Sequence, residues 1–137
     1  MSTYQQMIFV NLAVDDVAAS RAFFTALGYP INEQFSTDDT ASVVISDTIV
    51  VMLLAKKRYA DFTTKDIADS VSTSEVLLCL SAESRDKVDE LVGRALAAGG
   101  TEPREAQDHG QMYGRAFDDL DGHTFEVMWM DPAVVQG

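Results

Sequence analysis

The sequence predicts an α+β fold built from two tandem β-α-β-β-β modules. Two observations support this prediction. An alternating apolar stretch followed by a helical pattern occurs twice, over Met7–Leu27 and again over Glu75–Ala98, and short extended runs follow each copy. Placing Val10–Val14 over Val76–Leu80 brings the halves into register at an offset of 66 residues. The second half therefore reads as a structural copy of the first.

The first module is predicted over residues 7–55. Met7–Val14 alternates as a strand, and Asp15 and Asp16 can cap the helix that follows, because their side chains can accept hydrogen bonds from its first turn. The helix is expected over Val17–Leu27, and Gly28 suits the left-handed position after it. Three extended runs are expected next, at Ile31–Ser36, Ala41–Ile45 and Thr48–Leu54.

Residues 56–74 are polar and lack a sustained alternation, which predicts a linker with one helical turn around Thr64–Asp69. The second module is predicted over residues 75–130. It begins with a strand, a helix and a further strand, expected at Glu75–Ser81, Ser84–Ala98 and Thr101–Ala106.

A hairpin is predicted to close the second module. Its runs, Gln111–Phe117 and His123–Met130, are joined around Asp121 and Gly122, and glycine tolerates the positive φ of a tight turn. Glu126 lies in mid-strand on a face of large apolar side chains, where carboxylates are depleted. Either this face is open to water, or it lines a cleft in which Glu126 binds a metal, a ligand or a second carboxylate.

Composition narrows the class of partner. With 22 acidic and 10 basic residues, the net charge of −12 argues against nucleic acid and anionic membranes. The longest apolar run, Ile49–Ala55, is far shorter than the ~20 residues of a membrane span, and no cationic leader precedes an apolar segment. The single Cys79 cannot form an internal disulfide. We therefore expect a soluble, cytoplasmic protein.

Two segments, NLAVDDVAASRAFFTALGY (Asn11–Tyr29) and FDDLDGHTFEV (Phe117–Val127), together with the duplicated module, resemble the vicinal oxygen chelate superfamily. This superfamily contains glyoxalase I, bleomycin-resistance proteins and extradiol dioxygenases. The resemblance covers nearly the whole chain and implies a single domain, 1–137, with the glyoxalase/bleomycin resistance/dihydroxybiphenyl dioxygenase-like fold. In that fold the two modules form a curved mixed sheet around a cleft, with helices outside. The resemblance also implies a homodimer.

The resemblance places the superfamily's metal ligands at four positions, which here hold Phe9, Met52, Glu75 and Glu126. A zinc, nickel or iron ion needs three or four ligands, usually including imidazole, so no metal cofactor is expected. If one divalent ion does bind, its ligands would be Glu75 and Glu126. For His109 and His123 a solvated or turn-capping role is favoured over metal binding.

The strand alternation and the resemblance predict an apolar cleft with a few polar groups, which is typical of a small-molecule pocket. The alternative is that these side chains simply fill the centre of the sheet. Cys79 is expected to be a buried and inert thiol, because no basic neighbour in sequence lowers its pKa. The candidate ligand-binding residues are Phe9, Asn11, Met52, Leu77, Tyr113, Arg115 and Met128.

Two functions remain open. One is metal-free binding of a small organic molecule, as in bleomycin-resistance proteins. The other is a lyase, isomerase or dioxygenase of the glyoxalase type, with Glu75 and Glu126 as catalytic residues. The fold implied by the resemblance brings these two carboxylates close together, so that one of them would have a raised pKa. Glu126→Gln would then remove most binding or activity and cost little stability.

Overall fold

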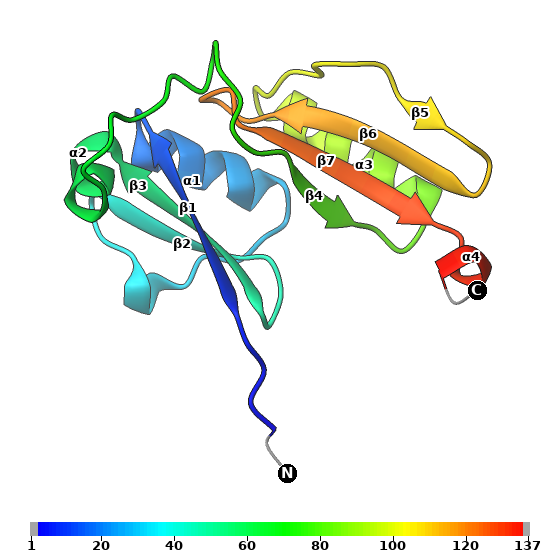
Figure 1. The fold of residues 1–137 in the computed structure, drawn as a ribbon, viewed down its shortest axis with the longest axis horizontal. Helices are drawn as coiled ribbons and strands as arrows, with labels where there is room; N and C mark the ends of the chain where they lie inside the picture. The colour runs from blue at the N-terminus through cyan, green and yellow to red at the C-terminus, as the bar shows by residue number, and fades with distance from the viewer. Residues whose placement is uncertain (1–2, 136–137) are drawn as a thin grey trace. The chain divides into compact units, whose positions relative to one another are not determined.

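The computed structural model of the chain describes residues 3–135, which divide between Ala68 and Asp69 into two compact units. Each unit contains one β-sheet with a long α-helix packed along it, as Figure 1 shows. The two modules, and with them the α+β class, are confirmed. Among the described residues, no helix is long and apolar enough to cross a membrane.

The sheet of the first unit has the strand order β1-β3-β2. β1 (Ile8–Val14) runs parallel to β3 (Ile49–Ala55), and β2 (Thr40–Val44) is antiparallel to β3. Helix α1 (Val17–Ala26) packs against β2 and β3. Because strand residues alternate between faces, one face supplies the core beneath α1. Its largest fully buried side chains are Val14, Phe23, Phe24, Val43, Val51 and Leu53.

The ends of α1 follow the sequence prediction. The side chain of Asp16 accepts a hydrogen bond from the backbone N–H of Ala19 at 3.0 Å, so Asp16 is the N-cap. Gly28 has a φ of 104°, a left-handed conformation that other residues adopt only with strain. The helix is therefore bounded by the two residues that the sequence predicts for these roles.

The sheet of the second unit has the strand order β4-β7-β6-β5. β4 (Leu78–Ser81) is parallel to β7 (Thr124–Met130), while β6 (Met112–Asp118) and the short β5 (Gln107–Asp108) continue the sheet in antiparallel pairings. Helix α3 (Arg85–Ala97) begins after its N-cap, Ser84, and packs against β6 and β7. Its core includes Val88, Val92, Phe117, Phe125 and Val127. A short helix, α4 (Pro132–Val135), follows β7.

Two predicted elements of the first unit differ from the structure. The run Ile31–Ser36 is not a strand: Ile31 makes a single bridge to Val43, and a 3-10 turn, η1 (Glu33–Phe35), follows. The side chain of Asn32 caps this turn by accepting from the N–H of Gln34, which competes with a sheet ladder. The helical turn predicted around Thr64–Asp69 is also wrong. Instead, α2 (Lys56–Tyr59) and η2 (Ala60–Phe62) follow β3 directly.

The second unit also departs from the predicted boundaries. β4 begins at Leu78, so that Glu75 lies before the strand and is exposed. The run Thr101–Ala106 forms only one bridge, Thr101 to Asp118, and contains Pro103, which has no N–H to give a ladder.

The predicted offset of 66 residues between the two modules pairs strand residues that point to the same face of the sheet. Equivalent helix residues, however, are separated by two residues more than this offset. The N-caps Asp16 and Ser84, and the buried Phe24 and Val92, correspond at an offset of 68.

Candidate functional site

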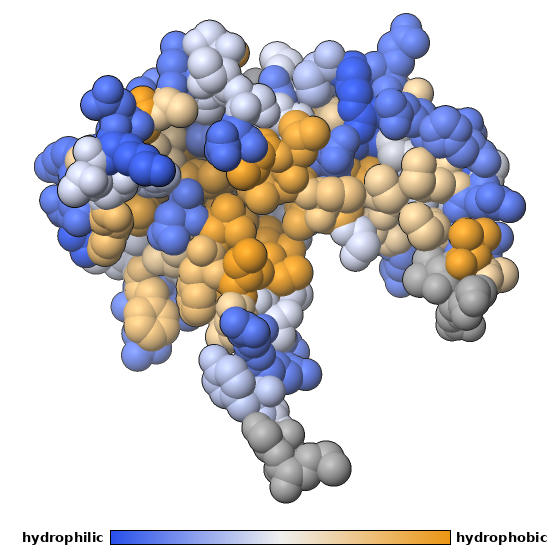
Figure 2. Space-filling view, viewed as in Figure 1, coloured by the Kyte–Doolittle hydropathy of each residue, from blue (hydrophilic) through white to orange (hydrophobic). Residues whose placement is uncertain are grey.

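Each sheet has a second face, the open face, which alternates with the core positions beneath α1 or α3. In the first unit this face carries Phe9, Asn11, Met52 and Leu54, and in the second it carries Cys79, Glu126 and Met128. Figure 2 shows apolar side chains gathered along β1, where Ile8 and Phe9 are more than half exposed. The open faces are therefore the candidate binding surfaces.

A groove of about 600 Å³ lies on the open face of the first unit. Two of the predicted ligand-binding residues, Asn11 and Met52, form part of its wall. Two phenylalanines that the sequence prediction missed, Phe35 from η1 and Phe62 from η2, are also part of the wall and are 61% and 65% exposed. The other lining residues are Gln34, Thr37, Asp39, Thr40, Leu54, Arg58 and Asp61.

The groove contains charges of both signs. The guanidinium of Arg58 donates to Asp61 at 2.9 Å and lies over the ring of Phe62, 4.7 Å from its centroid. Asp39 accepts a hydrogen bond from the Thr37 hydroxyl at 2.8 Å, which is the main reason why the pKa of Asp39 lies below its ordinary value. The groove therefore combines apolar walls with a fixed carboxylate and a paired guanidinium.

The open face of the second unit places Glu126 beside an arginine. The side chain of Glu126 is 24% exposed, and the guanidinium of Arg104 donates to it at 2.6 Å. In the parallel register Glu126 lies opposite Cys79, whereas Glu75 is four residues earlier and outside β4. The predicted partnership of Glu126 with Glu75 is therefore wrong. The compensating cation is Arg104, which the sequence prediction missed.

Cys79 is exposed rather than buried, which corrects the prediction. The inertness of its thiol stays a prediction, which the direction of the thiol pKa favours. Partial burial raises its pKa, the nearby charge of Glu126 raises it further, and Arg104 opposes the shift only in part. The thiol therefore stays protonated at neutral pH.

Tyr113 and Arg115 do not share the face of Glu126, so that their predicted place in a cleft with Glu126 is wrong. Arg115 lies opposite Val127 in the antiparallel register, on the face covered by α3. The Tyr113 hydroxyl donates to Asp89 of α3 at 2.6 Å, and Arg115 donates to Asp89 at 3.0 Å and to Glu102 at 2.9 Å. The hydrogen bond from Tyr113 is the main cause that lowers the pKa of Asp89. These residues tie α3 to β6.

The remaining predicted contact residues lie at or near the open faces. Phe9 on β1 and Leu77, just before β4, are 54% and 58% exposed, and Met128 on β7 is half-buried opposite Gly114. Their role in binding stays a prediction.

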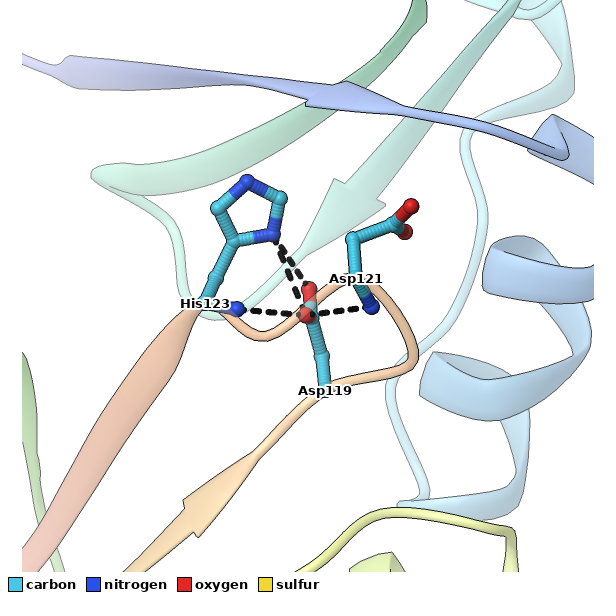
Figure 3. Close-up of side chains that lie close together, drawn as sticks. All are labelled: Asp119, Asp121 and His123. Atoms are coloured by element: carbon cyan, nitrogen blue, oxygen red, sulfur yellow. Dashed lines mark hydrogen bonds and ion pairs between the residues drawn. The ribbon is translucent and has the colours of Figure 1, made fainter. Parts of the chain in front are cut away.

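The hairpin turn between β6 and β7 brings Asp119, Asp121 and His123 together (Figure 3). One carboxylate oxygen of Asp119 accepts from the backbone N–H groups of Asp121 and His123 at 3.0 and 2.9 Å, and the other lies 2.8 Å from His123 Nδ1. The turn spans five residues, 119–123, and Gly122 has the expected positive φ, 90°. These contacts place His123 in the turn, as predicted.

Opposing influences act on the pKa of the His123 imidazole. Burial alone would lower its pKa, but the hydrogen bond to Asp119 and the charges of Asp119, Asp121 and Asp118 outweigh burial and raise that pKa above 6.5. The protonated form therefore makes an ion pair inside the turn.

The four positions at which the resemblance implies metal ligands do not fit a metal ion. Phe9 and Met52 offer no nitrogen or carboxylate oxygen, Glu75 is exposed before β4, and Glu126 is paired with Arg104. Transition metals need three or four such donors. The donor set is therefore wrong for the superfamily's usual ion.

Residues 6–46 match the family model for the bleomycin resistance protein-like N-terminal region. A hypothetical protein from S. aureus shares 30% identity over 93% of this chain and 95% of that chain, with a TM-score of 0.77. A glyoxalase/bleomycin resistance protein/dioxygenase family enzyme from Burkholderia phytofirmans PsJN shares 20% over 92% and 99% of the two chains, with a TM-score of 0.75.

A glyoxalase-related enzyme from Fulvimarina pelagi also shares 20% identity, over 92% of this chain and 88% of that chain, with a TM-score of 0.77. No curated protein matches the chain. The chain belongs to the glyoxalase/bleomycin resistance protein/dioxygenase superfamily, also known as the vicinal oxygen chelate superfamily.

Proposed function

We propose that the protein binds a small organic molecule in the groove of its first unit, without the superfamily's usual metal ion. The observation that supports this is the groove itself, in which Asn11 and Met52 meet the exposed rings of Phe35 and Phe62. The groove combines four apolar side chains with polar and charged ones, and a concave surface that offers both apolar contact and hydrogen-bonding groups can hold a small molecule.

The lining residues suggest what such a ligand needs. Stacking of an exposed phenylalanine ring on a flat apolar ligand is favourable. It removes apolar surface from water and restricts few side-chain rotamers. Met52 can adapt its shape to an irregular ligand, and the Asn11 side chain and the Asp39 carboxylate supply polar contacts. We therefore expect a flat organic molecule with at least one hydrogen-bonding group.

Phe9 is proposed to contact a ligand on the open face of the first unit, and Leu77 and Met128 are proposed as contact residues on the second unit taken by itself. A homodimer and a cytoplasmic location are proposed as well. The exposed apolar side chains of Ile8 and Phe9 are consistent with a second copy covering part of β1. A monomeric mass in light scattering at about tens of micromolar would remove the dimer from this proposal.

The alternative is a lyase, isomerase or dioxygenase that uses Glu75 and Glu126. It gains no support from the arrangement of these residues, since Glu75 is exposed before β4 and Glu126 is held by Arg104. No catalytic step is therefore assigned to them.

Binding of Nile red, a flat and neutral dye, tests the proposal. We expect saturable binding that weakens about tenfold in Phe35→Ala and in Phe62→Ala, because each change removes one ring from the wall. Val71→Ala is the control, since Val71 is 79% exposed and outside the groove. Equal affinity in all four proteins, or unsaturable binding, would contradict the groove as the site.

A further inference from the structure

The pair formed by Arg104 and Glu126 is the most strongly polar feature of the open face of the second unit. Glu126 is fixed in the middle of β7, and Arg104 reaches it from the segment between the Thr101 bridge and β5. Their contact of 2.6 Å is a charge-assisted hydrogen bond, and the side chains are 33% and 24% exposed. Such partial burial makes the interaction stronger than that of a fully exposed pair.

This pairing differs from what the resemblance implies. Glu126 occupies a position where the superfamily would use a carboxylate to hold a metal, yet its charge is balanced by a guanidinium. The residues at the other three positions, described above, do not complete a metal site. A permanent cation is therefore present on this face without any ion.

We propose that Arg104 takes the place of the metal ion as the fixed cation of this face, and that it binds an organic oxyanion such as a carboxylate or sulfonate. This site is additional to the groove of the first unit and does not depend on the function proposed for that groove.

The donor geometry of arginine supports the proposal. A guanidinium carries five N–H donors in a planar fork that matches the two oxygens of a carboxylate. Among residues 3–135, Arg104 donates to Glu126 and, at 3.4 Å, to the carbonyl of Glu105. Donors therefore remain for a ligand on a side chain that is one-third exposed. Glu126 holds the guanidinium in place, which reduces the entropy lost when a ligand binds.

The neighbours of the pair favour an anion over a cation. The two charges neutralise each other, but a cationic ligand would have to displace Arg104 to reach Glu126, whereas an anionic ligand can use the guanidinium donors that Glu126 leaves open. The thiol of Cys79 opposite Glu126 stays protonated because its pKa is raised, and it adds no negative charge. The half-buried Met128 offers apolar contact for the rest of the ligand.

Three probes of similar size, benzoate, benzamide and benzylamine, separate the charge of a ligand from its shape. We would titrate each into ¹⁵N-labelled full-length protein and follow the amide signals of Cys79, Arg104 and Glu126. Benzoate is expected to shift these signals with an affinity about tenfold higher than that of benzamide, and benzylamine is expected to leave them unchanged.

Variants then test the role of each charge. Arg104→Gln is expected to abolish the preference for benzoate. Arg94→Gln removes the same charge from an exposed position on α3 and is expected to keep the preference. Glu126→Gln retains an acceptor for Arg104 but removes a negative charge, so its affinity for benzoate should equal or exceed that of the natural protein. Should Arg104→Gln fail to fold, Arg104→Lys is used instead and should bind benzoate more weakly, because it lacks the fork.

Four results of the titrations with benzoate and its analogues would overturn the proposal. They are equal binding of benzoate and benzamide by the natural protein, a retained preference in Arg104→Gln, a full benzoate affinity in Arg104→Lys, and a loss of benzoate binding in Glu126→Gln as large as that in Arg104→Gln. Zinc that shifts the same amide signals at one equivalent would also overturn it, because the metal would then compete with Arg104 for Glu126.

Discussion

The two units follow one plan but stabilise their helix–sheet contacts with different chemistry. In the first unit α1 inserts Phe23 and Phe24, which are almost fully buried and pack edge-to-face with ring centroids 5.2 Å apart. In the second unit α3 contributes the smaller Val88 and Val92 and adds a polar network through Asp89. The duplicated pattern therefore preserves the apolar faces of the strands but not the means of attaching the helix.

The open faces differ even more than the cores. The first unit has a groove walled by Phe35, Phe62 and Met52, whereas the second has the Arg104–Glu126 ion pair. Core positions are constrained by packing on both copies, while open-face positions are free to diverge. Differences in function are therefore expected to lie on the open faces.

The largest expected effect concerns the cores, which should be equally important in both units. Phe24→Ala and Phe117→Ala should each lower the free energy of unfolding by about 4 kcal/mol, because both rings are almost fully buried. Phe35→Ala, on the open face, should cost less than about 0.5 kcal/mol. Chemical denaturation measures all three. A cost for Phe35→Ala similar to that of Phe24→Ala would show that the groove is part of the core.

The next effect concerns the hairpin turn of the second unit. Gly122 has a positive φ, and a Cβ there would lie 2.7 Å from the Ser70 carbonyl oxygen, so Gly122→Ala should cost about 3 kcal/mol. Gly93→Ala on α3 is the matched control. Nothing lies within 4 Å of a Cβ added at Gly93, so Gly93→Ala should raise the free energy of unfolding by up to about 1 kcal/mol. Thermal unfolding of both variants checks the difference, and equal costs would refute the close approach of residue 70.

A smaller effect tests the polar attachment of α3. Arg115→Met should cost about 1–2 kcal/mol, because it removes hydrogen bonds to Asp89 and Glu102 and leaves both carboxylates without their guanidinium. Arg94→Met removes an exposed i,i+4 pair on the same helix and should cost about 0.5 kcal/mol or less. If the two variants lose equal stability in denaturant, the network does not distinguish the second unit from the first.

The smallest effect is a pH dependence of the hairpin turn. The folded-state pKa of His123 is raised above 6.5, so its ion pair with Asp119 stabilises the fold fully below that pH. This stabilisation is lost as the pH rises through the raised pKa. The stability difference between the natural protein and His123→Asn should therefore be larger near about pH 6 than near about pH 8. Denaturation midpoints at both pH values measure it, and a difference that does not fall with pH would be contrary to this account.

Local signals in the sequence predicted the fold well. The N-cap Asp16, the left-handed Gly28 and the hairpin around Gly122 each depend on a few neighbouring residues, and all three are confirmed. Helix boundaries are within a residue or two, because apolar periodicity reports directly on the buried face. The main errors, at Ile31–Ser36 and Thr101–Ala106, arise where a side-chain cap or a proline replaces a ladder.

The site was predicted less completely, since side-chain partners depend on register. The antiparallel register places Tyr113 opposite Trp129 and Arg115 opposite Val127, on the helix-covered face, and the sequence alone does not fix this register. Arg104 lies 22 residues before Glu126, and nothing in its neighbouring sequence indicates that the two side chains form a pair. The groove residues Phe35 and Phe62 come from short turns whose position the alternation of strands does not encode.

The central claim is that this protein balances the charge of Glu126 with Arg104 and has no metal site at the open-face positions implied by the resemblance. Metal analysis tests this claim most directly. Full-length protein purified without chelator would be incubated with equimolar zinc, nickel, manganese and iron(II), desalted and measured by elemental mass spectrometry. We expect less than about one-tenth of an ion per chain that is lost in Glu126→Gln, because the four positions implied by the resemblance offer only the carboxylates of Glu75 and Glu126. About one ion per chain that is lost in Glu126→Gln would contradict the account.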